Sequence, residues 1–584
     1  MTSPIDRLRP AAPVHRTVGE LASRFGLELR AATGTTGTAA DDASALVEVA
    51  SVASDDRVVA EGELFVALPG SRAHGATFAP GAVARGAHAV LTDREGAHVL
   101  EQAGTAVPVL VAEDPRALLG PVAAWVFGNP AERLSTFAVT GTNGKTTTTY
   151  LVEHVLRAVG WRTGLVGTVE TRSGDRVLPS RLTTPEAADL QAVLATMVED
   201  DVRTLAMEVS SHALALHRVD GVVFDVAGFT NLSQDHLDFH GDLPAYFEAK
   251  AALFTPSHAR RGVVVVDDAW GERMVDAAQV PVATLRVGPP PGAPVGPSGG
   301  AAEPVPDSAH DADWTVRDVV PGPSRTSFTV RHRDGVQVRT TTSLPGHFNV
   351  ANAALALVMV LEAGVDHRDV QAALDSVGGL AAAVPGRMEI VSEPPHAPRV
   401  VVDFAHNTDA LELALAALRP TTAGRLVVVF GATGDRDRGK RPAMGAVAVD
   451  GADVVVVTDD DPHGEDPAAI RAEVLPGAFA ARDTAASGPG ARDVVVQEVA
   501  PRARAIHEAI AAAGPEDTVL VAGRGHEVWQ EVAGVDLALD DRVEARAALA
   551  ARGPDVPPWQ EPGTDAGRTT GPTDTQHDQK EHHA

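Results

Sequence analysis

Residues 137–149 read FAVTGTNGKTTTT, an apolar segment followed by a loop rich in glycine and threonine. Glycines let the backbone turn tightly and bring its N–H groups close to phosphate oxygens. Lys145 supplies a positive charge for the β- and γ-phosphates, and Thr146 offers a hydroxyl to Mg²⁺. This stretch predicts a nucleoside triphosphate site. Its loop residues are Gly141, Thr142, Asn143, Gly144, Lys145, Thr146 and Thr147.

The loop departs from the usual phosphate-binding pattern, because Val139 stands where the first glycine is expected. The alternative interpretation is a turn with an ordinary surface lysine. The flanking segments favour the nucleotide site, since a strand-like run precedes the loop and a helix-like run follows it as far as Gly160.

Short valine-rich segments alternate with helix-like stretches along most of the chain. This pattern is typical of an α/β fold with parallel sheets covered on both faces. Ligands in such folds bind at the C-terminal ends of the strands, so the residues just after each strand are the candidates for chemistry. The expected strands include 204–209, 222–229, 263–266, 400–404, 426–430, 453–458 and 518–522.

Composition changes divide the 584 residues into three domains and a tail. The first domain is expected at 1–130, ending at Gly128-Asn129-Pro130, and the second at 131–383. The third spans 384–552 and starts at the segment that opens with Val384. A Pro/Gly/Ala-rich insertion at about 288–312 and the polar tail 553–584 are expected to be disordered.

The overall composition excludes several functional classes. A net charge of −29 argues against binding to nucleic acid or to an anionic membrane surface. No apolar run is long enough to span a membrane, and the N-terminus has no signal-peptide core. The absence of cysteine excludes disulfides and thiolate chemistry. We therefore expect a cytoplasmic protein without membrane insertion.

Two strand ends carry polar groups suited to metal or phosphate. Glu208 is a carboxylate within an otherwise apolar strand, where an unpaired charge is costly. It is either a salt-bridged structural residue or a Mg²⁺ ligand. After strand 222–229, the residues Asn231, Asp235 and His236 form a polar cluster, which favours a site in a chain with a phosphate loop.

A series of long motifs resembles the Mur ligases of peptidoglycan precursor synthesis. The resemblance runs in order through about residues 45–550 and is strongest to the members that add a diamino acid. The motifs are GTNGKTTTT (141–149), TTP (183–185), MEVSSHALALHR (207–218), TNLSQDHLDFHG (230–241), LPGHFNVANAALAL (344–357), VPGRMEIV (384–391), VVDFAH (401–406), GATGDRDRGKRPAMG (431–445) and AGRGHEVWQ (522–530).

The resemblance implies a UDP-sugar domain, a central P-loop ATPase domain and a C-terminal Rossmann-like domain. It also implies an ATP- and Mg²⁺-dependent ligase that contributes to cell-wall biogenesis, and hence to cell shape and division. ATP phosphorylates the D-glutamate carboxylate of UDP-N-acetylmuramoyl-L-alanyl-D-glutamate. The amine of a diamino acid then attacks the acyl phosphate.

Site residues transfer from the family position by position. Lys145, Lys250, Glu208 and His236 are the expected catalytic residues, and Thr146, Glu208, His236 and Lys250 as a carbamate are the expected metal ligands. ATP should also meet Asn231, Asn349, Arg387 and Asp403. The UDP-muramoyl-peptide should be held by Ser54, Asp56, Ser71, Thr183, Thr184, Ser210 and Arg218.

Two of these positions, Lys250 and Asp56, have local sequences that differ from what their expected role suggests. The pattern of residues alone interprets Lys250 as a surface lysine of a helix, and only the resemblance implies that CO₂ converts it into a carbamate able to bind a second Mg²⁺. In the first domain, Asp56 stands where the family has a serine for the uridine. Ser54 or the loop at Ser71 is expected to compensate.

The residues expected to bind the diamino acid are Arg436, Asp460, Asp461, His463, Gly523 and Glu527. Diaminopimelate-adding members have Asp-Asn-Pro-Arg where this chain has Asp460-Asp461-Pro462-His463. A bidentate arginine–carboxylate pair is hard to replace. Three consecutive carboxylates, starting at Asp459, suit a distal ammonium better. The expectation is therefore L-lysine or L-ornithine, with meso-2,6-diaminopimelate as the alternative.

Two further hypotheses about the function stay open. One is a related ligase such as folylpolyglutamate synthase, and the other is a non-catalytic UDP-sugar-binding protein on the same fold. The segment 207–218 speaks against the first, and the retained set of charged groups speaks against the second. A monomer is expected.

Overall fold

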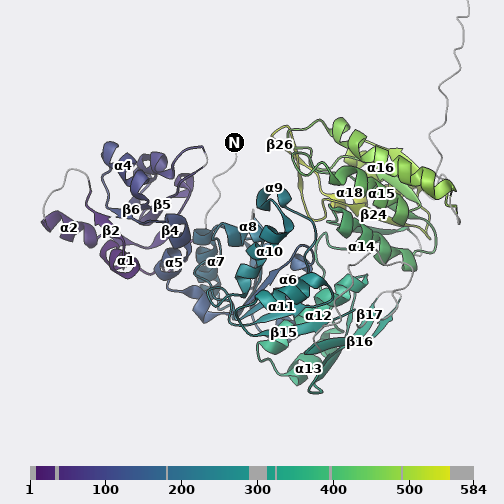
Figure 1. Cartoon of the computed structure of the whole chain (residues 1–584), viewed down its shortest axis with the longest axis horizontal. Helices are drawn as coiled ribbons and strands as arrows, with labels where there is room; N and C mark the ends of the chain where they lie inside the picture. The colour runs from purple at the N-terminus through teal and green to yellow at the C-terminus, as the bar shows by residue number, and fades with distance from the viewer. Residues whose placement is uncertain are drawn as a thin grey trace, which may run out of the picture.

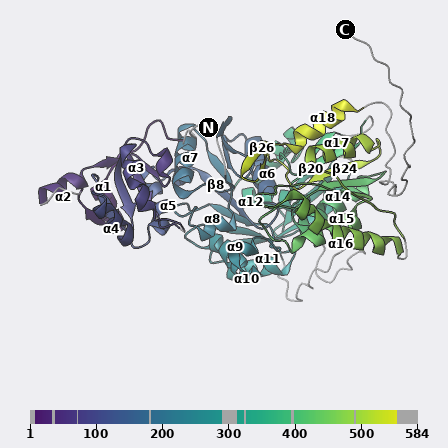
Figure 2. The same ribbon diagram turned by 90° about the horizontal axis from the view of Figure 1, so that it is seen from above.

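The computed structural model describes residues 8–32, 38–70, 72–178, 182–288, 312–322, 325–392, 397–487 and 491–552. These residues form three lobes in chain order, with the central lobe between the other two (Figures 1 and 2). Each lobe contains its own sheet and its own apolar core. The predicted α/β class and three-domain architecture are confirmed. The predicted insertion and tail lie almost entirely outside the described residues.

The N-terminal lobe contains a sheet of order β2-β7-β6-β5-β4, in which only β2 runs antiparallel to its neighbour. A short pair, β1 with β3, lies beside it. The strands are β1 Arg16–Thr17, β2 Glu28–Arg30, β3 Glu48–Val49, β4 Ser51–Ala53, β5 Glu63–Ala67, β6 Ala87–Thr92 and β7 Val109–Val111. The helices are α1 Val18–Phe25, α2 Thr38–Ala45, α3 Ala79–Ala84, α4 Arg94–Gln102 and α5 Pro115–Val126.

The central lobe contains a sheet of order β11-β10-β9-β12-β8-β13-β14-β15-β16-β17-β18. Neighbouring strands run parallel along the order β9-β12-β8-β13-β14-β15-β16, and antiparallel strands extend both edges, β10 and β11 at one and β17 and β18 at the other. The strands are β8 Ser135–Thr140, β9 Thr163–Val166, β10 Thr171–Ser173, β11 Arg176–Leu178, β12 Thr204–Glu208, β13 Val226–Phe229, β14 Gly262–Val265, β15 Val282–Arg286, β16 Trp314–Pro321, β17 Thr326–His332 and β18 Gln337–Thr342.

Helices cover both faces of this central sheet, as continuous apolar strands require. One face packs against α6 and α12, and the other packs against α7, α8, α10 and α11. The helices of this lobe are α6 Lys145–Ala158, α7 Ala187–Glu199, α8 Ser211–Ala215, α9 Leu237–His240, α10 Leu243–Ala251, α11 Ala269–Ala277, α12 His347–Glu362 and α13 His367–Val377.

The C-terminal lobe contains a sheet of order β19-β20-β24-β21-β22-β23, parallel except at β19. A hairpin, β25 with β26, projects from the end that faces the central lobe. The strands are β19 Glu389–Ser392, β20 Arg399–Asp403, β21 Leu426–Phe430, β22 Val454–Val457, β23 Val495–Glu498, β24 Thr518–Ala522, β25 Trp529–Val532 and β26 Val535–Ala538. The helices are α14 Thr408–Leu418, α15 Lys440–Gly451, α16 Pro467–Ser487, α17 Arg502–Ala512 and α18 Asp541–Ala551.

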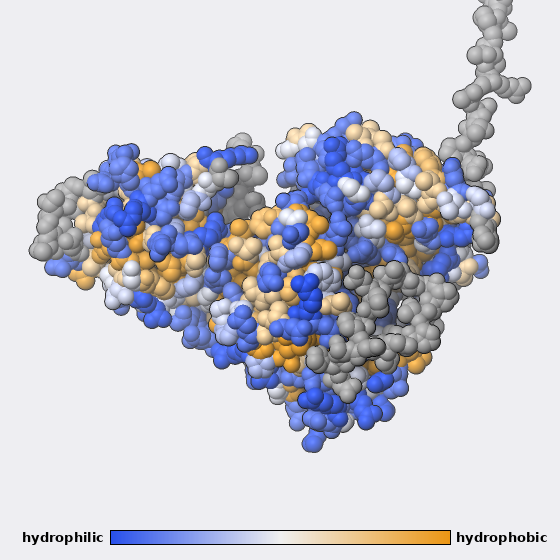
Figure 3. All heavy atoms as spheres, in the orientation of Figure 1, coloured by the Kyte–Doolittle hydropathy of each residue, from blue (hydrophilic) through white to orange (hydrophobic). Residues whose placement is uncertain are grey.

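The N-terminal lobe is fixed to the central lobe through α5 and α7. Small residues let the two lobes approach closely: a Cβ on Gly120 would lie 2.0 Å from the carbonyl oxygen of Asp220. Alanines of α7 pack into the core of the N-terminal lobe. Figure 3 shows hydrophobic residues gathered over the central lobe on the face in view, with hydrophilic residues over much of the other two lobes.

The structure confirms most of the predicted strands. The exception is 222–229, where the regular strand β13 begins only at Val226. The preceding residues form a turn and a single bridge from Phe224 to Ala259. None of the helices in the described ranges is both long and apolar enough to cross a membrane.

Candidate active site

The phosphate loop leaves β8 and enters α6 at Lys145. Gly141 adopts φ +148°, and a Cβ there would lie 1.8 Å from Thr230 Oγ1, so no larger residue fits. The Lys145 ammonium donates to the carbonyl oxygens of Gly141 and Thr142 at 2.9 and 2.8 Å. Burial lowers the pKa of Lys145, while Glu208 acts in the opposite direction. The loop therefore presents a half-buried lysine at a helix N-terminus, which suits a phosphate group.

Glu208 ends β12 and is only 1% exposed. Its Oε2 accepts from Thr146 Oγ1 at 2.9 Å, and its Oε1 accepts from the backbone N–H of Thr168 at 2.7 Å. The Thr168 hydroxyl also donates to Oε2, at 3.1 Å. Among the described residues no ion pair holds Glu208, so the alternative of a salt-bridged structural glutamate is not what the structure shows. Because these three donors are neutral, the hydrogen bonds do not compensate the negative charge of the Glu208 carboxylate, which can therefore bind a cation.

The residues predicted to hold the muramoyl-peptide adjoin Glu208. The Thr184 hydroxyl donates to the Glu208 carbonyl oxygen at 2.9 Å, and the Thr183 and Thr168 hydroxyl oxygens lie 3.0 Å apart. The backbone N–H of Ser210 donates to Thr184 Oγ1, and Arg218 reaches the Thr184 carbonyl oxygen. These four predicted residues therefore lie together, next to the candidate metal ligand.

Lys250 lies on α10 and is 1% exposed, unlike the surface lysine that its local sequence indicates. Its ammonium donates to the Gly141 carbonyl oxygen at 2.8 Å and lies 4.2 Å from the centroid of the Tyr246 ring. Burial and the nearby Lys145 hold the pKa of Lys250 well below its usual value. A larger fraction of this amine is therefore neutral than in an exposed lysine, and only a neutral amine can react with CO₂.

The polar cluster after β13 lies against the phosphate loop. Asn231 Oδ1 accepts from the backbone N–H of Asn143 at 3.0 Å, and Asn231 Nδ2 donates back to the Asn143 carbonyl oxygen at 3.2 Å. His236 has φ +54° and its ring is 4.8 Å from that of His212. Burial lowers the pKa of His236 to about 4, with Asp235 opposing the shift and Lys145 contributing to it. His236 is thus held neutral near the loop.

The C-terminal lobe reaches this site through Arg387. One guanidinium nitrogen lies 3.4 Å from Thr146 Oγ1, and the guanidinium stacks 4.2 Å from the centroid of the Phe404 ring. Asp403 accepts from the backbone N–H groups of Met388 and Ala405, and burial raises its pKa. Asp403 therefore shapes the loop that carries Arg387.

Asn349, predicted to approach ATP, is turned away from the loop. Its amide donates to the carbonyl oxygen of Pro345 at 2.7 Å and its oxygen accepts from Asn352. Asn352, one turn further along α12, faces the loop instead: a Cβ on Gly144 would lie 2.3 Å from Asn352 Oδ1. Asn352 is therefore a residue of α12 in contact with the loop, and the assignment of Asn349 to ATP stays a prediction.

A cleft of about 640 Å³ separates the central and C-terminal lobes beside the phosphate loop. Asp235, His236 and Asp238 line it on one side, and His406 and Lys440 line it on the other. Arg436, predicted to bind the diamino acid, also lies here, 3.8 Å from Asp238. The cleft is thus bordered by charged groups of both signs from two lobes.

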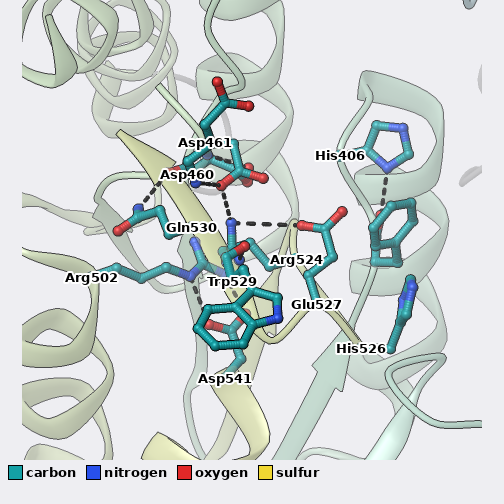
Figure 4. Close-up of polar contacts among 12 residues, drawn as sticks. His406, Asp460, Asp461, Arg502, Arg524, His526, Glu527, Trp529, Gln530 and Asp541 are labelled. Atoms are coloured by element: carbon teal, nitrogen blue, oxygen red, sulfur yellow. Dashed lines mark hydrogen bonds and ion pairs between the residues drawn. The ribbon is translucent and has the colours of Figure 1, made fainter. Parts of the chain in front are cut away.

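The other residues predicted to bind the diamino acid form a separate cluster around Arg524 (Figure 4). Arg524 is fully buried and pairs with Asp461, and it lies 3.6 Å from Glu527. A Cβ on Gly523 would lie 2.4 Å from Asp460 Oδ2, so a larger residue there would displace that carboxylate. His463 pairs with Glu531 of the β25–β26 hairpin at 2.8 Å.

The acidic run at 459–461 is less negative than its sequence indicates. Asp459 pairs with Arg471 and Asp461 pairs with Arg524. Asp460 Oδ2 is buried and has no hydrogen-bond partner in the part of the chain that the structure describes. Burial and the neighbouring Asp460 raise the pKa of Glu527 to about 8. The charge argument from three consecutive carboxylates is therefore weaker than the sequence indicates, because two arginines distant in the sequence pair with two of them.

In the N-terminal lobe, Asp56 lies 3.3 Å from Arg85, and Ser54 is half-buried at the end of β4. Ser71 lies outside the described residues. The assignment of Ser54, Asp56 and Ser71 to the uridine stays a prediction.

The polar groups at the phosphate loop fit Mg²⁺ in one respect. Thr146 and Glu208 offer a hydroxyl and a carboxylate in mutual contact, and Mg²⁺ is commonly held by one or two carboxylates together with substrate phosphates. No group of three His, Cys, Asp or Glu side chains suited to a metal occurs within the described ranges. Further ligands would come from substrate phosphates and water, with His236 and a Lys250 carbamate as the other predicted contributors.

Known families match all three lobes. Residues 139–360 match the Mur ligase middle domain, 386–525 the Mur ligase glutamate ligase domain, and 48–124 the Mur ligase family catalytic domain. The chain belongs to the Mur ligase family. This assignment confirms the resemblance found in the sequence and the expected class of ATP-dependent, peptide-forming ligase.

Individual Mur ligases resemble the chain along most of its length. The UDP-N-acetylmuramyl-tripeptide synthetase of Leifsonia xyli subsp. xyli is 44% identical over 95% of this chain and all of its own. The UDP-N-acetylmuramoyl-L-alanyl-D-glutamate–2,6-diaminopimelate ligase of Streptomyces avermitilis is 47% identical over 86% of this chain and 92% of its own. A solved structure of a ligase with that second name is 31% identical, covers 86% of this chain and 95% of its own, and has a TM-score of 0.56.

Several residues of this Mur ligase site were not anticipated from the sequence. Thr168 follows strand β9, so the rule that ligands meet strand ends could have indicated it. Arg524 lies within a quoted motif, but its partner Asp461 is 63 residues away. His406 likewise lies in a quoted motif and lines the cleft.

Replacing Arg387 with alanine should reduce turnover by about 10- to 150-fold, because a hydrogen bond from a charged group contributes about 1.5–3 kcal/mol. The loss should appear in KM for ATP and in kcat together, since Arg387 connects the C-terminal lobe to Thr146. Phosphate release at varied ATP concentrations measures both. Arg399→Ala is the control, because that side chain donates to Thr421 Oγ1 instead. Unchanged kinetics in Arg387→Ala would contradict this role.

Proposed function

We propose that this chain joins meso-2,6-diaminopimelate to the D-glutamate of UDP-N-acetylmuramoyl-L-alanyl-D-glutamate at the expense of ATP. The observation that carries the ligase chemistry is the convergence of groups at the ends of β8 and β12. Lys145, Glu208 and the buried Lys250 surround the loop. Thr183 and Thr184 lie beside Glu208, where the acid substrate would sit.

The reaction activates a carboxylate that does not react with amines in water. The D-glutamate carboxylate takes the terminal phosphoryl group of ATP and ADP is released. The neutral amine of the diamino acid then attacks the acyl carbon, phosphate leaves, and the amine loses a proton. Lys145 and the loop N–H groups hold the phosphates, while Thr183, Thr184, Ser210 and Arg218 orient the acid.

Mg²⁺ would be held by Thr146 and Glu208, with His236 and a carbamate on Lys250 close to the loop, and it would screen the negative charges of the two reactants. Arg387 and Asp403 belong to the other lobe, so closure of the lobes completes the nucleotide site. Because ATP and the UDP-sugar are its substrates, the proposal places the reaction in the cytoplasm. The monomeric state stays a prediction.

Diaminopimelate is favoured over L-lysine and L-ornithine for two reasons. Relatives with 43–47% identity, including that from Streptomyces avermitilis, are named as diaminopimelate ligases. In the cluster around Arg524, Asp459 and Asp461 are neutralised by arginines, and Glu527 has a pKa of about 8 and is therefore largely protonated at neutral pH. Asp460 Oδ2 then stays without a partner in the described ranges and can accept from the distal ammonium, while a distal carboxylate is not repelled by three charges.

L-lysine or L-ornithine is the second candidate, and one observation favours it. His463 replaces the arginine that holds the distal carboxylate in diaminopimelate-adding members, and its ring pairs with Glu531. The folylpolyglutamate-synthase-like and non-catalytic readings are less well supported, because matches extend over the N-terminal lobe and over nearly the whole chain.

A substrate comparison tests this proposal. Phosphate release is measured with ATP, Mg²⁺, the UDP-muramoyl-dipeptide and each of the three diamino acids at equal concentration. Diaminopimelate should give the highest kcat/KM by at least about tenfold, a typical effect of one matched polar group. Faster turnover of lysine or ornithine would support the second candidate. Phosphate release triggered by a folate, or no release at all, would contradict the ligase proposal.

A further inference from the structure

Arg524 is a fully buried cation at the centre of the diamino-acid cluster. It lies on the loop that follows β24, and Figure 4 shows it between Asp461 and Glu527. One guanidinium nitrogen pairs with Asp461, and the other donates to the carbonyl oxygen of Trp529 at the start of β25. Arg524 therefore joins three walls of the cluster, which are the acidic run, the Glu527 loop and the β25–β26 hairpin.

The pair with Asp461 is needed for charge balance. Removing one partner of a buried ion pair leaves the other charge uncompensated, which is far more costly than losing a surface pair. Asp461 also accepts from the backbone N–H of Glu531 at 3.0 Å, so its carboxylate is fully engaged within the protein. In contrast, Asp460 Oδ2 has no partner in the described ranges. Of the three carboxylates in the acidic run, Arg524 thus neutralises Asp461 and Arg471 neutralises Asp459, while Asp460 keeps one oxygen without a partner.

The three diamino acids differ mainly in the charge at their far end. The far end of lysine or ornithine carries an ammonium alone, whereas that of diaminopimelate carries an ammonium and a carboxylate. A pocket with an additional free anion attracts the first kind and repels the second. The net charge of the cluster can therefore discriminate between lysine or ornithine and diaminopimelate.

We propose that Arg524 is a specificity-determining residue: by neutralising Asp461 it leaves Asp460 Oδ2 as a carboxylate oxygen of the cluster without a partner in the described ranges, and so favours a diamino acid with a zwitterionic far end. Arg524 acts through Asp461 and is a positioning residue. This inference rests on the proposed function, but it concerns the ratio of two kcat/KM values, for diaminopimelate and for lysine. It holds whichever of the two substrates the wild type prefers.

The test compares the wild type with single and double variants of the Arg524–Asp461 pair. Arg524→Gln should lower the kcat/KM ratio of diaminopimelate to lysine by at least about tenfold, because Asp461 becomes a second free anion. The double variant Arg524→Gln/Asp461→Asn removes both charges and should return the ratio to within about threefold of the wild type. Arg524→Lys keeps the charge and should stay near the wild-type ratio, which also covers a failure of Arg524→Gln to fold.

A matched control comes from the opposite end of the same sheet. Arg419 pairs with Asp453 at 2.6 Å and donates to the carbonyl oxygens of Thr422 and Gly424, so it too links loops through an aspartate. Arg419→Gln should leave the ratio unchanged. A ratio that does not fall in Arg524→Gln, or that the double variant does not restore, overturns the role of Arg524. A wild type that ligates no diamino acid contradicts the proposed function instead.

Discussion

Replacing Lys250 with alanine is expected to reduce ligase turnover by about a thousandfold, the scale seen when a group that stabilises the transition state is removed. Lys250 is buried against the Gly141 carbonyl oxygen and the Tyr246 ring, next to Lys145. As a carbamate it would carry a negative charge beside the phosphate loop and hold a cation there. Added acetate or propionate should restore part of the activity, because a short carboxylate can occupy the space that the side chain leaves.

Lys250→Arg separates this chemistry from simple packing. Arginine keeps the positive charge and much of the volume, but its guanidinium does not form a stable carbamate, so this variant should be as inactive as Lys250→Ala. Phosphate release in the presence of all substrates measures both variants, and thermal unfolding checks their folding. Substantial activity in Lys250→Arg, or failure of every short carboxylate to restore Lys250→Ala, would contradict the role of the carbamate.

Glu208→Gln should cost about 100- to 1000-fold in turnover and raise the Mg²⁺ concentration needed for half-maximal activity. The change keeps the shape of the side chain but removes its charge. Three donors converge on the carboxylate, from the Thr146 hydroxyl and from the hydroxyl and N–H of Thr168. An amide can accept on one side only, so its NH₂ group would face donors.

Glu153→Gln is the matched control for this prediction. Glu153 is also a buried glutamate of the central lobe, but it accepts from Thr163 Oγ1 and pairs with Arg157 and Arg172, away from the phosphate loop. Titration of Mg²⁺ at saturating ATP compares the two variants. The Mg²⁺ requirement of Glu153→Gln should equal that of the wild type. If Glu208→Gln showed that same requirement, Glu208 would not be a metal ligand.

Much of the fold could be predicted from local patterns. The valine-rich strands and the loop at 141–149 depend on near neighbours in the chain, and strand, loop and helix follow one another as the sequence indicates. The position of Glu208 at a strand end was also visible, because the pattern of apolar residues locates the end of β12. Ser210 follows that strand closely, whereas Thr184 was assigned to the same substrate only through the family resemblance.

What could not be predicted depends on contacts between distant segments. The charge of the run at 459–461 depends on Arg471 and Arg524, and no local pattern reveals those pairs. Lys250 is buried because the loop at Gly141 covers it, although its own helix has no strongly apolar face. In the same way, Asn352 and not Asn349 faces the loop, because the packing of α12 against α6 decides which side of the helix is presented.

The contact from Arg387 to Thr146 has a consequence for how much ATP is hydrolysed without ligation. With the lobes apart, the nucleotide would lack a cation that only the C-terminal lobe can supply. Since the cluster around Asp460 lies on that same lobe, arrival of the amino acid and completion of the nucleotide site are expected to be linked. With this arrangement, the rate of ATP hydrolysis should be low when no diamino acid is bound.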